Sequence, residues 1–142
     1  MSTLPATRSI SISACLLIAA SLLLAHPADA ACAKWTATSR TATAITGDIT
    51  TCPGTLSFGN GTKLKLQFVG NKKGSWAFGS ADSAMIYRVT PPSDPLLLNG
   101  NTLCGEPVHF IALSPTGDGR LGMTVFGAQL SDFCAVYFYD PR

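Results

Sequence analysis

The sequence predicts an all-β domain: a small antiparallel barrel or sandwich of about eight strands, held by two disulfides and preceded by a cleaved signal helix. Three observations predict this fold class. Turn-forming residues recur every eight to twelve positions between residues 31 and 142. The clearest apolar–polar alternation has the period of a strand, and no stretch keeps a helical period for three turns. Four cysteines remain once an N-terminal leader is removed.

The first thirty residues have the three parts of a secretory signal peptide. Arg8 precedes an apolar run over residues 14–25, and Ala28-Asp29-Ala30 forms a small-x-small cleavage site. The apolar run is shorter than the roughly 20 residues of a membrane span, so cleavage is favoured over an uncleaved anchor. Lipidation of Cys32 is a further alternative, but Asp29 stands where a lipoprotein signal favours an aliphatic residue. We therefore expect a signal peptide over 1–30, a single β domain over 31–142, no stable membrane span after cleavage, and a periplasmic or secreted protein.

The charge balance excludes one class of partner. The net charge of +2 is small, and the basic residues are scattered along the chain. A nucleic-acid-binding domain instead gathers its Lys and Arg residues into a strongly basic face. We therefore expect no nucleic-acid partner.

Four cysteines in a short exported chain indicate two disulfides. Cys32, Cys52, Cys104 and Cys134 allow three connectivities, and the sequence alone leaves the choice open. The pairing Cys32–Cys52 and Cys104–Cys134 is favoured because each bond would close a short loop between neighbouring strands.

Apart from the closing run of the chain, nine runs of apolar and β-branched residues are separated by Gly, Pro, Asn and Asp. The best of them, 62–69, places Leu64, Leu66 and Phe68 on one face and polar residues on the other. It follows Gly59-Asn60-Gly61, a strong hairpin signal. The other expected strands cover 35–40, 45–50, 55–58, 75–78, 85–90, 108–113 and 121–126, with a brief apolar run at 96–98.

The closing run, 133–139, is the densest aromatic and β-branched stretch outside the leader. Its composition predicts a strand. Both of its faces are largely apolar, which favours packing on each side.

No residue pattern predicts catalysis or a cofactor. His109 is the only histidine after the leader, and nothing in the sequence places a nucleophile and an orienting carboxylate beside it. The cysteines lack the close spacing of zinc ligands. We therefore expect no catalytic residue, no metal and no cofactor, and the protein is predicted not to be an enzyme.

Two loops are candidates for binding a partner. The first, 79–84, is small and polar and leads to Tyr87, and the second, 90–95, is stiffened by prolines. Because a prolyl loop keeps its shape before binding, its ordering costs little. The candidate partner-binding residues are Ser80, Asp82, Ser83, Tyr87, Pro91, Pro92 and Asp94.

The stretch 79–87, Gly-Ser-Ala-Asp-Ser-Ala-Met-Ile-Tyr, resembles the Ser-Gly-x-x-x-Tyr loop of periplasmic and membrane-bound inhibitors of C-type lysozyme. In that family the loop enters the lysozyme cleft, and the resemblance implies a protein partner. The stretch departs from the family's pattern because Asp82 stands within it and Tyr87 comes late. Segments 87–92, 98–100 and 103–105 resemble small uncharacterised exported proteins of proteobacteria, a kinship that implies no activity.

Three hypotheses about function follow. The first is an exported, non-enzymatic binding or inhibitor module of the cell envelope, with a protein partner in the envelope or outside the cell. The second is a barrel that carries a small ligand between its apolar walls. The third and least favoured is a small hydrolase that uses His109.

Overall fold

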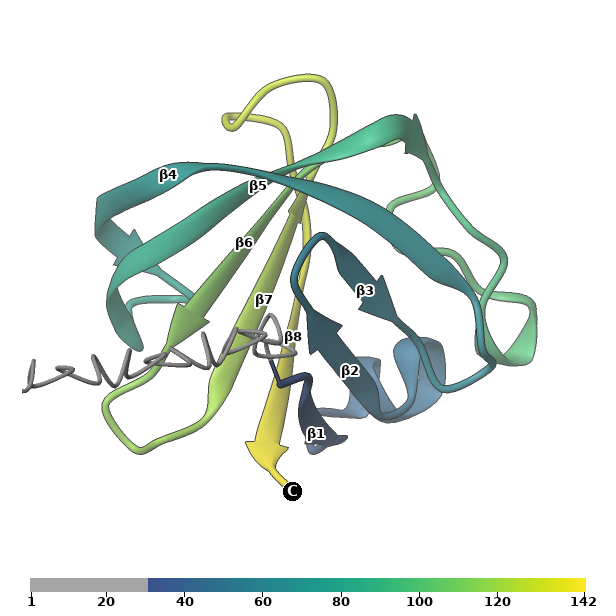
Figure 1. Ribbon diagram of the computed structural model, residues 1–142, viewed down its shortest axis with the longest axis horizontal. Helices are drawn as coiled ribbons and strands as arrows, with labels where there is room; N and C mark the ends of the chain where they lie inside the picture. The colour runs from purple at the N-terminus through teal and green to yellow at the C-terminus, as the bar shows by residue number, and fades with distance from the viewer. Residues whose placement is uncertain (1–30) are drawn as a thin grey trace, which may run out of the picture.

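The computed structural model describes residues 31–142, which form eight antiparallel strands closed into a barrel (Figure 1). The strands follow one another around the barrel in chain order, and the last closes it by pairing with the first. The predicted all-β class and the number of strands are confirmed, and the fold is a barrel rather than a sandwich. The predicted signal peptide, 1–30, lies outside the described residues. Within 31–142, no helix is both long and apolar enough to cross a membrane.

Ten elements make up this domain. They are β1 (Ala33–Ala37), the π-helical turn η1 (Ala42–Thr46), β2 (Ile49–Cys52), β3 (Thr55–Ser57), β4 (Lys63–Trp76), β5 (Ala81–Ser93), the 3-10 turn η2 (Leu98–Gly100), β6 (Val108–Pro115), β7 (Leu121–Phe126) and β8 (Phe133–Pro141).

Apolar side chains fill the barrel interior. Alternate residues of the strands point inward, as the two-residue period of a strand requires. On β7, for example, Leu121, Met123 and Val125 lie in the core, and on β8 Tyr137 and Tyr139 are fully buried. The barrel wall therefore surrounds packed side chains over most of its length.

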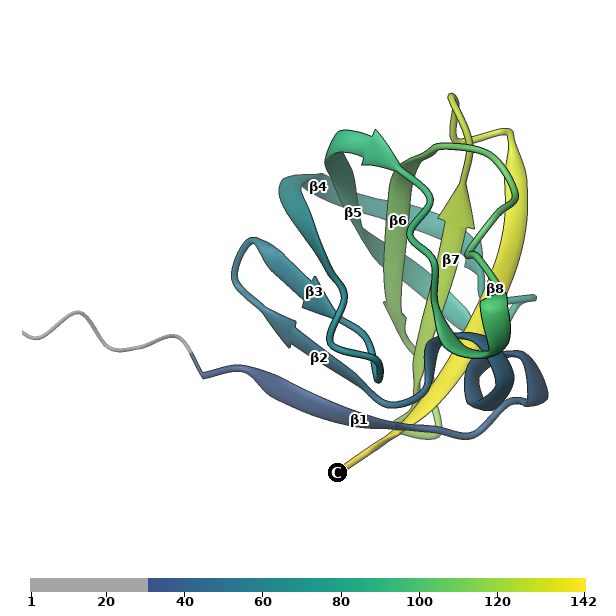
Figure 2. The same cartoon turned by 90° about the vertical axis from the view of Figure 1, so that its right-hand side faces the viewer.

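One end of the barrel is plugged by η1 and η2, which lie against each other (Figure 2). Thr46 of η1 is fully buried and hydrogen-bonds the Tyr139 hydroxyl at 2.8 Å. Gly47 has a φ of +62°, and its Cα lies so close to Gly59 that a Cβ on Gly59 would stand 3.2 Å from it. The plug thus brings backbone against backbone where side chains would not fit. The predicted strand 45–50 is wrong in its first half, because Ile45 and Thr46 belong to this turn and β2 begins at Ile49.

Both favoured disulfides are confirmed: Cys32–Cys52 and Cys104–Cys134. The first ties the start of β1 to the end of β2, and the second ties the connection between η2 and β6 to β8. Two disulfides in so small a domain are typical of proteins that fold outside the cytoplasm.

The β4–β5 hairpin is much longer than the sequence suggests. Residues 70–74, which separate the expected strands 62–69 and 75–78, lie inside β4. The predicted strand 75–78 is the end of β4 and a tight turn, and β5 runs from Ala81 through Pro92 to Ser93. The far half of the hairpin extends past the barrel and curves over the outside of the sheet (Figure 1). Polar and glycine residues are tolerated in the β4 arm of this half, because none of its residues is buried and nothing imposes alternation on it. Bulges between Phe68 and Gly70 and between Lys73 and Trp76 let it bend.

Candidate binding site: an aromatic groove at the hairpin tip

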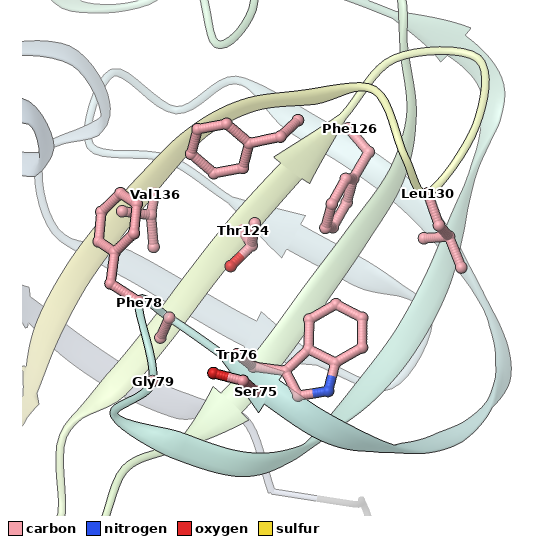
Figure 3. A pocket seen from close by; sticks show the side chains of 10 residues that line it. Ser75, Trp76, Phe78, Gly79, Thr124, Phe126, Leu130 and Val136 are labelled. Carbon is pink, nitrogen blue, oxygen red and sulfur yellow. The ribbon is translucent and has the colours of Figure 1, made fainter.

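Several hollows of similar volume lie on the described surface, and two of them are candidate binding sites. The first, which we call the aromatic groove, lies between the tip of the β4–β5 hairpin and the outer face of β7 and β8 and has a volume of about 450 Å³ (Figure 3). The second, which we call the barrel mouth, lies at the end of the barrel opposite the plug and has a volume of about 460 Å³. Both volumes fall within the range typical of small-molecule sites, roughly 300–1,000 Å³. The aromatic groove is lined by Ser75, Trp76, Ala77, Phe78, Gly79, Thr124, Phe126, Leu130, Phe133 and Val136.

The hairpin tip has an unusual backbone. Ala77 and Phe78 have φ values of +49° and +55°, and Gly79 has +82°. Two tight hydrogen bonds close the turn, from the Gly79 N–H to the Trp76 carbonyl at 3.0 Å and from the Ser80 N–H to the Ala77 carbonyl at 3.2 Å. Left-handed backbone costs an alanine or a phenylalanine roughly 1–2 kcal/mol per residue. Such conformations persist where surrounding contacts enforce them, and they concentrate at binding and catalytic sites.

Packing against β7 holds the tip in place. Gly122 leaves room for Ala77: a Cβ on Gly122 would lie only 2.6 Å from the Cβ of Ala77. The Trp76 ring packs edge-to-face on Phe126, with centroids 6.1 Å apart and planes at 88°. The Trp76 indole N–H donates to the Lys72 carbonyl at 3.1 Å. The position of the tip is therefore fixed before any partner arrives.

The fixed tip displays Phe78 to solvent. Its side chain is 77% exposed, and it contacts Phe133, which is 53% exposed. The two ring centroids are 5.8 Å apart and their planes are tilted by 60°. Phe133 begins β8, 55 residues further along the chain, so the pair is assembled by the fold. A third hollow, of about 440 Å³, is lined by the same pair together with Val136 and Phe138 of β8. The exposed apolar surface therefore extends beyond the aromatic groove itself.

A polar atom without a partner lies in the floor of the groove. Thr124 is 5% exposed, and its hydroxyl Oγ1 forms no hydrogen bond within the described part of the chain. Figure 3 shows Thr124 between Phe78 on one side and Trp76 and Phe126 on the other. Buried hydroxyls are nearly always hydrogen-bonded, so an unpaired one calls for an explanation.

The barrel mouth is apolar as well. Trp35, Phe68, Met85, Tyr87, Leu113 and Leu121 contribute to its lining. The Trp35 indole N–H donates to Thr51 Oγ1 at 3.1 Å, and the Tyr87 hydroxyl lies 3.7 Å from the Met85 sulfur. Leu113 and Leu121 belong to the packed core and close the hollow from below. The barrel mouth is thus a shallow hollow whose floor is the packed core of the barrel.

The predicted partner-binding residues do not form one site. Ser80, Asp82 and Ser83 lie at or just after the hairpin tip, beside the aromatic groove. Tyr87 lines the barrel mouth. Pro91 and Pro92 are exposed near the C-terminal end of β5, away from the hairpin tip. The predicted residues are therefore spread along the length of one long strand.

Asp94 has a structural role, because its carboxylate is hydrogen-bonded to the backbone of a nearby connection. Its carboxylate accepts hydrogen bonds from the backbone N–H groups of Leu103, Cys104 and Gly105, at distances between 2.6 and 3.3 Å. These bonds fold the 94–105 connection back on itself beside the Cys104–Cys134 disulfide. A carboxylate with three N–H donors serves as a structural anchor, and little of its bonding capacity is left for a partner.

One group of side chains in residues 31–142 is close enough to suggest a metal site, namely Cys104, Glu106 and Cys134. Both cysteines are joined in a disulfide, and a disulfide sulfur is not the thiolate that a metal binds. His109 is half-buried on β6 and does not belong to this group.

Sequence reasoning missed the residues of the aromatic groove, Trp76, Phe78, Thr124 and Phe133. One signal was available: Phe78 stands directly before Gly79-Ser80, where a hairpin turn normally has Asn, Asp or Gly. Searches against known protein families, curated proteins and solved structures found no match for this chain.

Proposed function

We propose that the protein is an exported, non-enzymatic binding module of the cell envelope, and that it binds a protein partner through the aromatic groove and the Phe78–Phe133 pair. The observation that carries this proposal is Phe78: a large apolar side chain, 77% exposed, on a backbone conformation unfavourable for it. Neither exposure nor conformation benefits the folded monomer. A bound partner would gain from both, because a rigid, exposed aromatic residue loses little entropy when it is buried.

The surroundings of Phe78 support a protein partner. Interfaces are centred on aromatic side chains that are buried on binding, within a patch that is depleted of charge. No ionisable side chain lines the aromatic groove, while Asp82 and Ser83 are exposed nearby on β5 and supply a polar rim. The predicted loop 79–84 is therefore retained in this proposal through its first residues, which border the groove.

The test compares three exposed phenylalanines. The full chain, exported by means of its own leader and purified, is immobilised as wild type, Phe78→Ala, Phe133→Ala and Phe68→Ala. Phe68 is the matched control because it is 55% exposed but lies at the barrel mouth. We expect the envelope proteins retained by the wild type to be lost from the Phe78 and Phe133 variants and kept by the Phe68 variant, as quantified by mass spectrometry. Equal retention by all four proteins, or no retention by the wild type, would refute the proposal.

The resemblance of residues 79–87 to lysozyme inhibitors suggests C-type lysozyme as the first partner to assay. Only the beginning of that stretch, Ser80 to Ser83, is near the hairpin tip, since Tyr87 lies at the barrel mouth. Inhibition of lysozyme that is lost in Phe78→Ala would support lysozyme as the partner. Full lysozyme activity in a stoichiometric excess of the protein would exclude it as the partner.

A second candidate function is the carriage of a small apolar ligand, and the barrel mouth favours it. Six large apolar or aromatic side chains contribute to a hollow of about 460 Å³ at a location where β-barrels commonly bind ligands. Under this hypothesis Phe68→Ala, not Phe78→Ala, should reduce the amount of ligand seen by native mass spectrometry of the exported protein. The same two variants therefore distinguish the two candidate functions.

A further inference from the structure

The walls of the aromatic groove suit an aromatic ring. Trp76 and Phe126 already meet edge-to-face, and Phe78 and Phe133 meet at a tilt. Phe78 stands across Thr124 from Trp76 and Phe126 (Figure 3). An aromatic ring placed over Thr124 could contact the faces of some neighbouring rings and the edges of others. Offset-stacked and edge-to-face contacts are the arrangements that aromatic pairs prefer. An aliphatic side chain would gain the burial but not these quadrupolar contacts.

The floor of the groove contains a hydroxyl oxygen that can accept a hydrogen bond from a ligand. Thr124 Oγ1 has no partner among residues 31–142, although a hydroxyl oxygen has two lone pairs to offer. Threonine χ1 moves between staggered rotamers, so the hydroxyl can turn toward a group seated above it. A ligand that donates a proton to this oxygen would remove the cost of leaving it unpaired.

The lining of the groove also excludes a charged ligand group. Its ten residues include no Asp, Glu, Lys, Arg or His. A charge brought into such a hollow would lose its hydration without gaining a counter-charge, which is strongly unfavourable.

These three properties lead to one chemistry. We infer that the aromatic groove binds a tyrosine or tryptophan side chain of the protein partner, with the phenol O–H or indole N–H donating to Thr124 Oγ1. This inference rests on the proposed function, because it specifies the residue of the partner that the groove recognises. Phenylalanine would have the ring without the donor, and leucine would have neither.

The test uses NMR titration of the uniformly ¹⁵N-labelled, exported protein with four neutral probes: N-acetyl-tyrosinamide, N-acetyl-tryptophanamide, N-acetyl-phenylalaninamide and N-acetyl-leucinamide. The chain has two tryptophans, Trp35 at the barrel mouth and Trp76 in the groove, so each hollow has its own indole N–H signal. Trp35→Phe assigns the two signals. We expect the Trp76 signal to shift with the tyrosine and tryptophan probes, which should bind about three- to tenfold more tightly than the phenylalanine probe, as expected for one neutral hydrogen bond.

Thr124→Val supplies the decisive comparison, because valine keeps the shape of threonine and removes the hydroxyl. We expect this variant to abolish the preference for the tyrosine probe over the phenylalanine probe while leaving the affinity for the phenylalanine probe unchanged. Ser114→Ala is the matched control, since Ser114 Oγ is also buried and unpaired but does not line the groove. It should leave the preference intact.

Three results would overturn the inference: an unchanged tyrosine preference in Thr124→Val, a response of the Trp35 signal alone, or no response of the Trp76 signal to any probe. None of them would refute the proposed function, which depends on whether the partner is lost from the Phe78 and Phe133 variants. Conversely, retention of the partner by Phe78→Ala would refute the proposed function even if free tyrosinamide bound the groove.

Discussion

The hydroxyl groups of Thr46 and Tyr139 meet at 2.8 Å inside the plugged end of the barrel, and both residues are fully buried. Thr46 Oγ1 also lies 3.1 Å from the Ala42 carbonyl and 3.0 Å from the Gly47 carbonyl. Because threonine has a single hydroxyl proton and carbonyls only accept, that proton goes to a carbonyl and Tyr139 donates to Thr46. This bond links the η1 turn to the closing strand β8.

The direction of that bond predicts an order of stabilities. Thr46→Val leaves the Tyr139 hydroxyl buried without an acceptor and should cost about 1–3 kcal/mol of unfolding free energy. Tyr139→Phe leaves Thr46 with its carbonyl acceptors and should cost less, about 0.5–1.5 kcal/mol. Urea denaturation measures both. A larger loss in Tyr139→Phe than in Thr46→Val would show that the donor had been assigned the wrong way round.

Stability should fall at alkaline pH because of Tyr137. Burial, together with the negative charge of Asp94, raises the pKa of Tyr137 to about 12, while the unfolded chain ionises near 10. Below pH 10 both states hold the proton, so the full stability is present. Between pH 10 and 12 only the unfolded state releases it, so the free energy of unfolding declines as pH rises.

Tyr137→Phe tests this assignment. The variant loses the hydrogen bond from the Tyr137 hydroxyl to the Leu103 carbonyl, 2.9 Å long, and should be about 0.5–1.5 kcal/mol less stable at pH 7. Its stability should nevertheless decline less steeply between pH 10 and 12. Buried Tyr139, whose pKa is also raised by burial, remains to give a residual slope. Parallel pH profiles for the variant and the wild type would contradict the role given to Tyr137.

The two disulfides should contribute unequally. Replacing Cys104 and Cys134 together by Ser should cost about 2–5 kcal/mol, the usual cost of removing a native bridge from a small exported domain. The same replacement of Cys32 and Cys52 should cost less, because Cys32 is exposed and lies near the expected mature N-terminus, where the chain can fray. Thermal denaturation of the two double variants gives the comparison. Equal losses would mean that the start of β1 is held as firmly as the connection after η2.

Contact between Gly122 and the hairpin tip yields a fourth stability test. Gly122→Ala would place a Cβ 2.6 Å from that of Ala77, so the tip must move away from β7. Overpacking of this kind typically costs about 1–3 kcal/mol. The Trp76 indole signal should shift, because its ring packs on Phe126 of the same strand. Gly117→Ala is the control, since no atom lies within 4 Å of its added Cβ.

The sequence predicts the strands of the barrel well where one face of the strand is buried. It predicts them poorly where neither face of the strand is buried. Leu64 and Leu66 alternate with lysines and lie in the core as expected, since the barrel interior imposes the period. Beyond Phe68 no residue of β4 is buried, and the polar run around Lys72 resembles a turn although it is a strand. The disulfides could be favoured from spacing because each joins segments that are close in the chain.

The aromatic groove could not be predicted in the same way. It depends on the hairpin tip curving back over β7, which places Phe78 beside Phe133 from a distant part of the chain. That curvature comes from two bulges and from the missing side chain of Gly122, none of which has a periodic signature. Thr124 alternates with core residues on β7, so its burial on the outer face becomes evident only once the tip covers it.

The left-handed backbone of Phe78 gives the final prediction. Asparagine tolerates this conformation much better than phenylalanine does, so Phe78→Asn should relieve part of the strain. Phe133→Asn is the matched control, because it makes the same exchange and removes the same ring pair at a strand residue without a positive φ. We expect Phe78→Asn to be more stable than Phe133→Asn by about 1 kcal/mol, since a left-handed non-glycine residue costs about that much. Both variants should lose the partner. If Phe78→Asn proved as destabilising as Phe133→Asn, the tip would carry no strain, and the exposure of Phe78 alone would have to support the proposed function.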